Sequence, residues 1–286
     1  MKKSKNSISD WLNKNGTIEM KNQIEEELFY NRIFNENCLD TMAKMEDNFI
    51  DLTVTSPPYD NLRTYKGFEF DWQKVIKELY RTTKQGGVVV WVVGDATEKG
   101  SETGTSFKQA LFAIDCGFKL HDTMIWNKGG FTAVGALKTR YAQVFEYMFV
   151  FVKGKLKTFN PIKDRKNKQF GRKQVGTIRQ KDGSTKDKST NGNITPEFGQ
   201  RFNDWLLYPE NNNNNRKHPA TFPEQLANDH IISWSNEGDL VYDCFMGSGT
   251  TAKMAKLNNR NYVGSEISEE YCGIIEQRLN DTGTLL

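Results

Sequence analysis

The chain has 286 residues, of which 37% are hydrophobic and 26% are charged. This composition is typical of a soluble protein that buries one sizeable core, with room for a smaller appended unit. No apolar run approaches the roughly 20 residues that cross a bilayer, and residues 1–6 lack the apolar segment of a signal peptide. We therefore expect a cytoplasmic protein and exclude a membrane protein.

Residues 1–30 are polar and form an N-terminal extension, with weak helical spacing at 8–12 and 24–29. From residue 31 the apolar spacing alternates between strand-like and helix-like segments. The expected strands span 31–34, 49–55, 88–93, 121–126, 145–152, 240–244 and 262–265. The expected helices span 39–45, 71–83, 106–116, 223–234, 249–257 and 269–279. This alternation predicts a doubly wound α/β sheet whose central strands are buried on both faces.

The alternation breaks at residues 153–217, which are basic, rich in Gly and Asn, and weakly periodic. The whole chain has a net charge of only +3, but residues 153–188 contain 13 Lys or Arg and 3 Asp, a local charge of +10. Such a block is either a solvated, disordered loop or an electrostatic surface for phosphates. We expect one α/β domain whose two halves, residues 31–152 and 218–286, are separated by this insert.

The cysteines and histidines do not form a ligand pattern. No C-x-x-C pair and no zinc-like spacing occurs among Cys38, Cys116, Cys244, Cys272, His121, His218 and His230. We expect the cysteines to be small buried hydrophobes in a reducing compartment, and we predict no metal site.

A glycine-rich turn follows the expected strand 240–244. Residues 247–252 fit G-x-G-x-x-A between a strand and a helix, where glycines allow a tight turn and the close approach of a ligand. Glu266 ends the next strand, 23 residues after Asp243, where a carboxylate can accept hydrogen bonds from two ribose hydroxyls. Taken alone, this pattern also fits nicotinamide enzymes or a purely structural turn.

A second motif follows the buried strand 49–55. Thr55, Ser56, Pro57, Pro58 and Tyr59 bring a small hydroxyl, a stiffened backbone and an aromatic ring to the end of that strand. In isolation the motif could be a simple turn.

Together the two motifs resemble the amino-methylating DNA methyltransferases, specifically the permuted group in which the catalytic motif precedes the cofactor motif. The resemblance spans about residues 31–280. It implies a Rossmann-like methyltransferase sheet, S-adenosylmethionine as cofactor, and an insert that recognises the DNA target. Protein glutamine methyltransferases carry a similar segment, but their cofactor motif comes first.

The resemblance assigns chemistry to the catalytic motif. The Ser56 oxygen and the Pro57 carbonyl would each accept one N–H of an exocyclic base amine and leave its lone pair facing the methyl group. Tyr59 would stack on a base that has left the duplex. No cysteine follows a proline, so the Pro-Cys nucleophile of ring-carbon methyltransferases is absent.

The cofactor motifs of the family also map onto this chain. The acidic residue that opens the glycine motif implies that Asp243 contacts the methionine portion, and residues 218–226 resemble the motif that precedes it. Residues 35–40 resemble the segment near the adenine, although Asn37 stands where Asp is usual. The cofactor residues implied in this way are Asn37, Cys38, Thr55, Phe222, Asp243, Phe245, Gly247, Ser248, Gly249, Thr250 and Glu266.

The first motif position favours one base. Family members with Ser there mostly methylate cytosine N4, and those with Asp mostly adenine N6, so Ser56 favours cytosine and leaves adenine as the alternative. In the insert, the candidate contacts to double-stranded DNA are Arg165, Lys166, Lys168, Arg172, Lys173 and Arg179.

Other partners and functions stay open. A cognate restriction endonuclease and a homodimer are possible by analogy with the family. From other classes, the chain could be a catalytically inactive DNA-binding protein on a methyltransferase fold, or a nicotinamide oxidoreductase. The oxidoreductase would leave the Ser-Pro-Pro-Tyr motif and the basic insert without a purpose.

Overall fold

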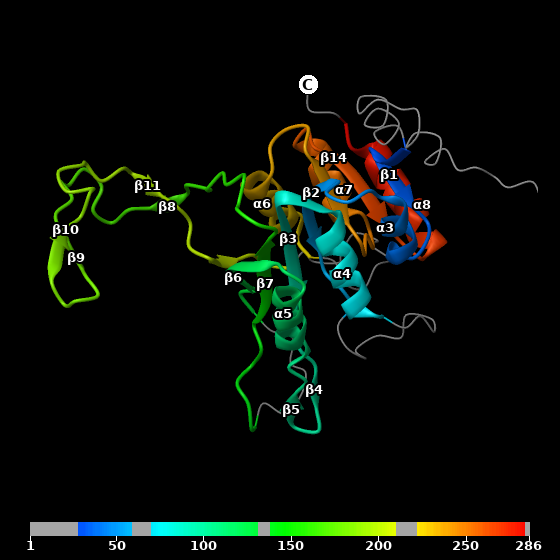
Figure 1. The fold of residues 1–286 in the computed structure, drawn as a ribbon, viewed down its shortest axis with the longest axis horizontal. Helices are drawn as coiled ribbons and strands as arrows, with labels where there is room; N and C mark the ends of the chain where they lie inside the picture. Colours follow the sequence, from blue (N-terminus) through cyan, green and yellow to red (C-terminus); the bar gives the residue numbers. More distant parts are fainter. Residues whose placement is uncertain (1–27, 59–69, 131–137, 210–221, 284–286) are drawn as a thin grey trace, which may run out of the picture.

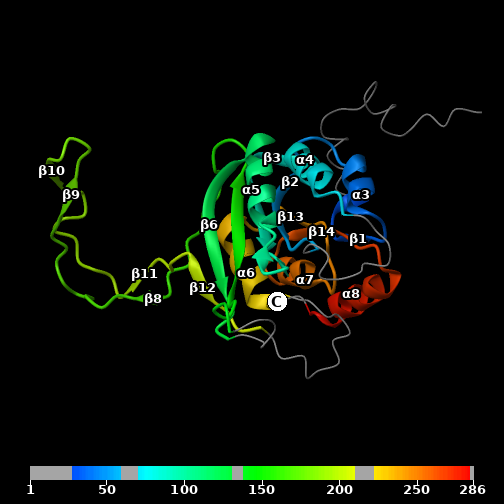
Figure 2. The same ribbon diagram turned by 90° about the horizontal axis from the view of Figure 1, so that it is seen from below.

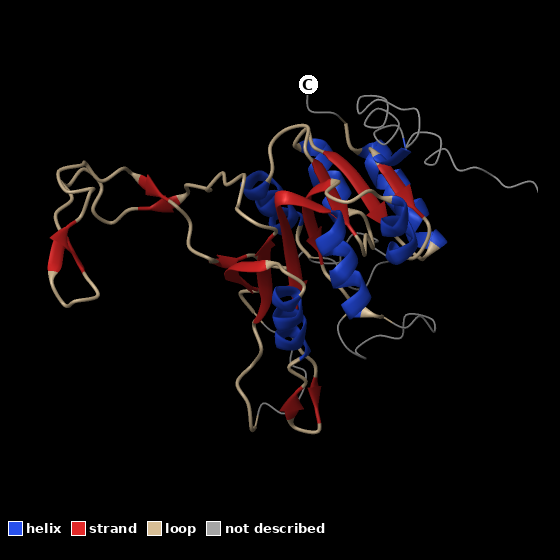
Figure 3. Cartoon of the chain, in the orientation of Figure 1, coloured by secondary structure: helices blue, strands red, loops and turns tan. Residues whose placement is uncertain are grey.

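A computed structural model describes residues 28–58, 70–130, 138–209 and 222–283. Its centre is an eight-stranded sheet (Figures 1 and 3). In spatial order the strands are β1 (Arg32–Phe34), β14 (Asn261–Ser265), β13 (Leu240–Asp243), β2 (Ile50–Thr55), β3 (Thr83–Val93), β7 (Phe145–Val152), β6 (Lys119–Asn127) and β12 (Asp204–Leu206). Strand β7 is antiparallel to both of its neighbours, and all other neighbouring pairs are parallel.

Helices cover both faces of this sheet. The helices are α3 (Cys38–Lys44), α4 (Trp72–Thr82), α5 (Thr105–Asp115), α6 (Glu224–Trp234), α7 (Thr250–Leu257) and α8 (Glu269–Asp281). Buried side chains of α3, α4 and α5 share one core cluster, and those of α6 and α7 share another. Helix α8 packs on α7 through Ile275 and Leu279. The prediction of a doubly wound α/β fold is confirmed.

Strand β3 shows why the central strands are continuously apolar. Val88, Val90 and Val92 belong to one core cluster, and Val89 and Trp91 belong to the other. Successive side chains of a strand point to opposite faces, so a strand covered on both sides needs apolar residues at every position. This strand begins at Thr83, earlier than the expected 88, because Thr83 already pairs with Ile50.

Two features of the sheet differ from the expectation. No helix connects β6 to β7 in the described residues, and β7 lies antiparallel between β3 and β6. Strand β12 falls inside the expected insert, yet it pairs with β6, and its Trp205 is buried in the core. The stretch that leaves the sheet therefore begins at about residue 153 and ends before β12, at about 203, whereas residues 210–217 of the expected insert lie outside the described residues.

Residues 153–203 form an arm that projects from the body (Figures 1 and 2). It contains two small antiparallel pairs, β8 (Arg165–Lys166) with β11 (Phe198–Gly199) and β9 (Thr177–Arg179) with β10 (Thr185–Asp187). The basic block therefore contains short paired strands joined by longer loops and turns.

Side chains at the base of the arm fix it to α6. The Arg201 guanidinium binds Asp164 and donates to the buried Asp229 at 2.6 Å. The Asn160 amide donates to the Ser235 carbonyl at 3.1 Å, where α6 ends. An ion pair with a buried partner and a helix-end contact together hold the direction in which the arm leaves the body.

The basic surface does not begin at Lys153, as the sequence suggested. Its side chain is buried, and its ammonium donates to the carbonyls of Tyr80 at 2.7 Å and Arg81 at 3.2 Å. Burial lowers the pKa of this lysine. Lys153 thus satisfies carbonyls at the end of α4, and the accessible cations begin beyond it, at Lys155.

The helices within the described ranges are all too short or too polar to cross a membrane. The expected helix at 8–12 and most of that at 24–29 lie outside the described residues.

His230 ties α6 to the sheet as a neutral side chain. Its Nδ1 accepts from the Trp234 indole at 3.2 Å, so the proton of the neutral ring is on Nε2, 3.2 Å from the Met148 sulfur. The ring also packs on Trp205, with 4.5 Å between ring centroids. Burial lowers the pKa of His230 from 6.5 to about 3.

This pKa shift predicts an acid-dependent loss of stability. Between pH 6.5 and pH 3 the unfolded chain binds a proton at His230 that the folded chain does not. The stabilisation is complete above pH 6.5 and falls as the pH drops, at up to about 1.4 kcal/mol per pH unit. Urea unfolding at pH 7, 6 and 5 should show a shallower pH dependence for His230→Gln than for the native protein. Parallel profiles would contradict the assignment.

Candidate functional site

The two sequence motifs meet at one edge of the sheet. Strands β2, β13 and β14 are parallel neighbours, so their carboxyl ends lie side by side. Ser56 follows β2, the glycine turn follows β13, and Glu266 follows β14. In doubly wound sheets this carboxyl edge is where ligands bind.

Asp243, the last residue of β13, links the motifs. It is 1% exposed, and its Oδ1 accepts from the Thr55 hydroxyl at 2.6 Å and from the Phe245 amide at 3.0 Å. Its Oδ2 accepts from the Thr251 hydroxyl at 2.7 Å. Burial raises the pKa of this carboxyl, and the three donors oppose that rise. One side chain therefore connects the end of β2, the glycine turn and the start of α7.

This geometry gives Asp243 a positioning role. Its oxygens point inward to protein donors, and a direct contact with the methionine portion of a cofactor stays a prediction. Thr55, expected as a cofactor residue, is fully buried and is the donor from β2.

The glycine turn has the shape expected from its sequence. Gly247 has φ +54°, and Gly249, which precedes α7, has φ +81°. A side chain at Gly249 would also collide with Ile275, because its Cβ would lie 2.9 Å from a methyl group there. Both backbone conformation and packing therefore require glycine at this position.

Glu266 is held in place by the same turn. Its Oε2 accepts from the Gly247 amide at 2.8 Å, and its Oε1 accepts from the Ser268 amide at 2.9 Å. Burial raises the pKa of this carboxyl. A carboxylate offers about four acceptor positions, so each oxygen keeps capacity for a second donor. An oriented pair of this kind suits two neighbouring hydroxyls.

The segment expected near an adenine begins α3. Asn37 caps this helix, because its Oδ1 accepts from the Leu39 amide at 2.9 Å. Cys38 is buried, and burial raises its pKa to about 12, so it acts as a neutral apolar group. Contacts of these two residues with a ligand stay predictions.

Aromatic rings line the region beside the turn. Phe245 meets Phe70 edge-on, with 5.2 Å between ring centroids, and lies 6.5 Å from Trp91. Phe222 packs on the core cluster under α6 and α7. Ser56 and Pro58 are partly exposed and Pro57 is buried, whereas Tyr59 and residues 218–221 lie outside the described residues.

Sequence reasoning missed a clamp on the glycine turn. Arg278 of α8 donates to the Ser248 carbonyl at 2.9 Å, to the Ser248 hydroxyl at 3.1 Å and to the Thr250 hydroxyl at 3.2 Å. The same guanidinium binds Glu224 at the start of α6, which also accepts from Lys253 at 2.8 Å. No local pattern marks Arg278, because its partners lie 28 to 54 residues away in the chain.

The predicted DNA contacts lie together on the arm, apart from the carboxyl edge. Arg165 is partly buried, donates to the Gln200 carbonyl at 2.9 Å and lies over the Phe202 ring, 4.5 Å from its centroid. It therefore has a structural role in the arm whatever else it contacts. The other five side chains are exposed; they are Lys166, Lys168, Arg172, Lys173 and Arg179.

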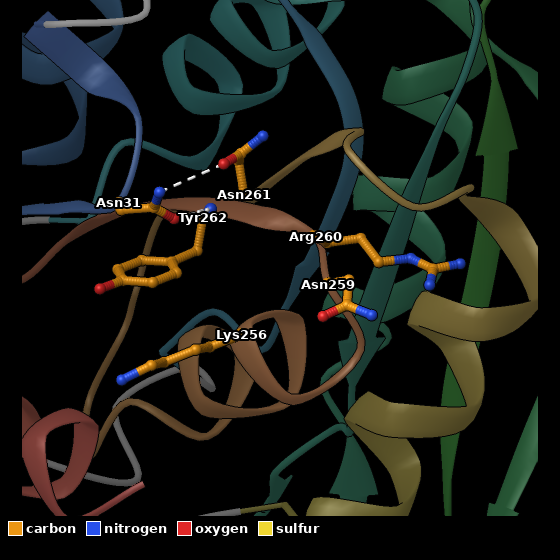
Figure 4. A pocket seen from close by; sticks show the side chains of 6 residues that line it. All are labelled: Asn31, Lys256, Asn259, Arg260, Asn261 and Tyr262. Carbon is orange, nitrogen blue, oxygen red and sulfur yellow. Dashed lines mark hydrogen bonds between the residues drawn. The ribbon is translucent and has the colours of Figure 1, made fainter. Parts of the chain in front are cut away.

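A surface hollow lies elsewhere (Figure 4). It is lined by side chains at the amino end of β14, including Asn31, Lys256 and Tyr262, and the Asn31 amide donates to Asn261 at 3.2 Å. Because β14 ends at the edge that carries Glu266, this hollow belongs to the opposite edge of the sheet.

Comparison with known proteins identifies the relatives of this chain. The model of a DNA methylase family matches residues 50–277. The orphan methyltransferase M.BamHII of Bacillus amyloliquefaciens is 56% identical over 243 residues, which cover 82% of this chain and 90% of the relative. The type II methyltransferase M.HpaI of Haemophilus parainfluenzae is 29% identical and covers 87% of this chain and 74% of its own length.

Solved structures share the fold. The PvuII DNA methyltransferase, described as cytosine-N4-specific, superposes with a TM-score of 0.63 at 20% identity, covering 86% of this chain and 85% of that one. TTHA0409 of Thermus thermophilus, described as a putative DNA modification methylase and solved in complex with S-adenosyl-L-methionine, superposes with a TM-score of 0.58 at 22% identity, covering 88% of this chain and 95% of that one.

The clamp predicts a local effect of Arg278→Gln. The turn loses three hydrogen bonds, and Glu224 loses one cationic partner while it keeps Lys253. We expect faster amide hydrogen exchange in residues 246–250 and a loss of about 1–3 kcal/mol in unfolding free energy. Gln277→Ala, at an exposed position of the same helix, is the control. Equal exchange in the two variants would refute the clamp.

Proposed function

The chain belongs to the DNA methylase family that modifies the N6 amine of adenine or the N4 amine of cytosine, and on that premise we propose that it methylates cytosine N4 in double-stranded DNA. The family match covers most of the chain, and the relative at 56% identity is itself a methyltransferase. The enzyme is therefore a DNA methyltransferase, and the choice of base is the step beyond family membership.

S-adenosylmethionine is the methyl donor of this family, and it supplies a methyl group activated by a positively charged sulfur. The residues at the carboxyl edge fit it. Glu266 presents two oriented oxygens that suit the ribose hydroxyls, and the backbone of Gly247 and Gly249 permits close approach. Asn37 begins the segment proposed to lie near the adenine.

The catalytic side chains act on the amine of the base. Its lone pair is delocalised into the ring, so the nitrogen must be drawn towards tetrahedral geometry before it can attack. The Ser56 oxygen and the Pro57 carbonyl accept one N–H each in this proposal, which holds the amine in the reactive orientation. Pro58 stiffens the backbone behind them.

The Asp243 link supports this chemistry at a distance. Thr55 immediately precedes Ser56, and its hydroxyl is fixed by Asp243, which is itself bound to the amide of Phe245 beside the glycine turn. The residue before the serine is thus held relative to the glycine turn by two hydrogen bonds, and a displacement of about 1 Å is enough to slow such a reaction severely.

The target base must flip out of the DNA duplex to reach this site. An amine that is paired inside a duplex cannot reach Ser56, so the target base has to leave the stack. The exposed cations of the arm provide attraction to the phosphates on either side, and we assign target recognition to this arm.

One observation carries the choice of base: Ser56 stands at the first position of the catalytic motif, at the carboxyl edge beside the glycine turn. A neutral hydroxyl there is the feature that favours cytosine N4 in the family. A cognate restriction endonuclease and a homodimer stay proposals. Relatives named as type II methyltransferases support the endonuclease, whereas the 56% identical relative is named as an orphan methyltransferase.

Mass spectrometry of nucleosides tests the proposal. Unmethylated DNA treated with the purified protein and S-adenosylmethionine should yield N4-methylcytosine. N6-methyladenine would move the assignment to the other base, and unmodified DNA would overturn the activity.

Ser56→Ala tests the role of the hydroxyl in the same assay. It should lower the single-turnover rate by about 100- to 1,000-fold, the scale of losing one oriented transition-state hydrogen bond, and leave cofactor binding close to normal. A variant that methylates at the native rate would rule out the proposed contact.

A further inference from the structure

The tip of the arm is a small β-ribbon. Strands β9 and β10 pair through Thr177 with Asp187, Ile178 with Lys186 and Arg179 with Thr185. All of these residues are exposed, as is the turn at 180–184 that joins them. A two-stranded ribbon of this kind is narrow enough to enter the major groove of B-DNA, which is about 12 Å wide.

The orientation of the ribbon suits DNA bound at the carboxyl edge. In Figure 1 the ribbon turns towards the same side as β4 (Thr97–Glu98) and β5 (Ser101–Glu102), which follow the carboxyl end of β3. The ion pair from Arg201 and the contacts of Asn160 hold the base of the arm to α6. DNA lying across the carboxyl edge would therefore extend towards the ribbon.

The two faces of the ribbon carry different chemistry. Side chains alternate along a strand, so Arg179 and Thr185 share one face with Thr177 and Asp187, while Ile178 and Lys186 share the other. Arg179 and Asp187 are diagonal neighbours on their face, and neither takes part in an ion pair within the described part of the chain.

The carboxylate of Asp187 helps to decide whether the ribbon only follows phosphates or also reads bases. The tip carries four cations, Arg179, Lys181, Lys186 and Lys188, and two carboxylates, Asp182 and Asp187. Asp182 accepts from the Ser184 amide and hydroxyl and so stabilises the turn. A surface that only followed phosphates would gain nothing from Asp187, because a carboxylate is repelled by the DNA backbone. In the major groove the same pair is useful, since Arg donates to guanine O6 and N7 and Asp accepts from the cytosine N4 amine.

Resting on the proposed function, we propose that the β9–β10 ribbon enters the major groove and that Arg179 and Asp187 read a guanine and a cytosine of the recognition sequence. Thr177 and Thr185 flank them with hydroxyls that suit either base. Lys186, on the opposite face, contributes attraction to phosphates without sequence choice.

The experiment compares three single variants of the full-length enzyme. The native protein first methylates a DNA library with randomised sequence, and sequencing of the modified sites defines its recognition sequence. Arg179→Ala should then accept other bases at one guanine position, with discrimination falling by about 10- to 100-fold. Asp187→Asn should relax one cytosine position in the same way.

Lys186→Ala is the matched control on the other face of the ribbon. It should keep the native recognition sequence, weaken cognate and non-cognate DNA alike, and reduce the slope of log affinity against log salt by about 0.9. All three substituted residues are exposed at the tip of the arm, so the melting temperatures of the three variants should match that of the native protein.

Native discrimination in both Arg179→Ala and Asp187→Asn would overturn the proposal, as would equal relaxation by Lys186→Ala. These results are distinct from failure of the proposed function, in which the native protein itself would modify no sequence in the library.

Discussion

The hydrogen bonds of the buried Asp243 carboxylate hold the two halves of the site together. Thr55 and Asp243 are 188 positions apart in the chain, yet a 2.6 Å hydrogen bond joins them. Thr251 and the Phe245 amide complete the coordination of this carboxylate. A buried charge is tolerated only when donors surround it, so the carboxylate constrains the end of β2, the glycine turn and α7 to one arrangement. The position of Ser56 relative to the glycine turn depends on it.

In the proposed function, the sheet places the chemistry at one edge and the recognition arm at the other. Seven strands run in one direction and bring Ser56, the glycine turn and Glu266 to the carboxyl edge. Strand β7 runs the other way, so it ends at the opposite edge, and the arm begins there at Lys153. The arm returns through β12, parallel to β6, and therefore also enters the sheet at that edge. If the arm recognises DNA as proposed, it must therefore reach past the sheet to meet DNA at the carboxyl edge (Figure 1).

Local sequence patterns predicted what depends on local physics. Apolar runs predicted most strands of the sheet, such as β3, and amphipathic spacing predicted helices such as α4. The glycines at 247 and 249 predicted a turn that the structure confirms. Contacts between residues far apart in the chain were not predictable from the sequence. Neither the direction of β7, nor the return of Trp205 to the core, nor the clamp by Arg278 leaves a periodic signal, because each depends on residues far away in the chain. Lys153 illustrates the same limit: its charge suggested a phosphate contact, and only the fold shows that helix carbonyls surround its ammonium.

The most direct test of the Asp243 link compares two threonines on the same face of β2. Thr55 donates to Asp243, whereas the Thr53 hydroxyl is buried without a hydrogen-bond partner among the described residues. Valine preserves the shape of threonine, so Thr55→Val removes one donor from a buried carboxylate and Thr53→Val removes none. At saturating cofactor, the single-turnover methylation rate should fall by about tenfold or more in Thr55→Val and stay within about twofold of native in Thr53→Val. Native rates in Thr55→Val, or equal losses in both variants, would contradict the claim that this carboxylate positions the end of β2 and with it Ser56.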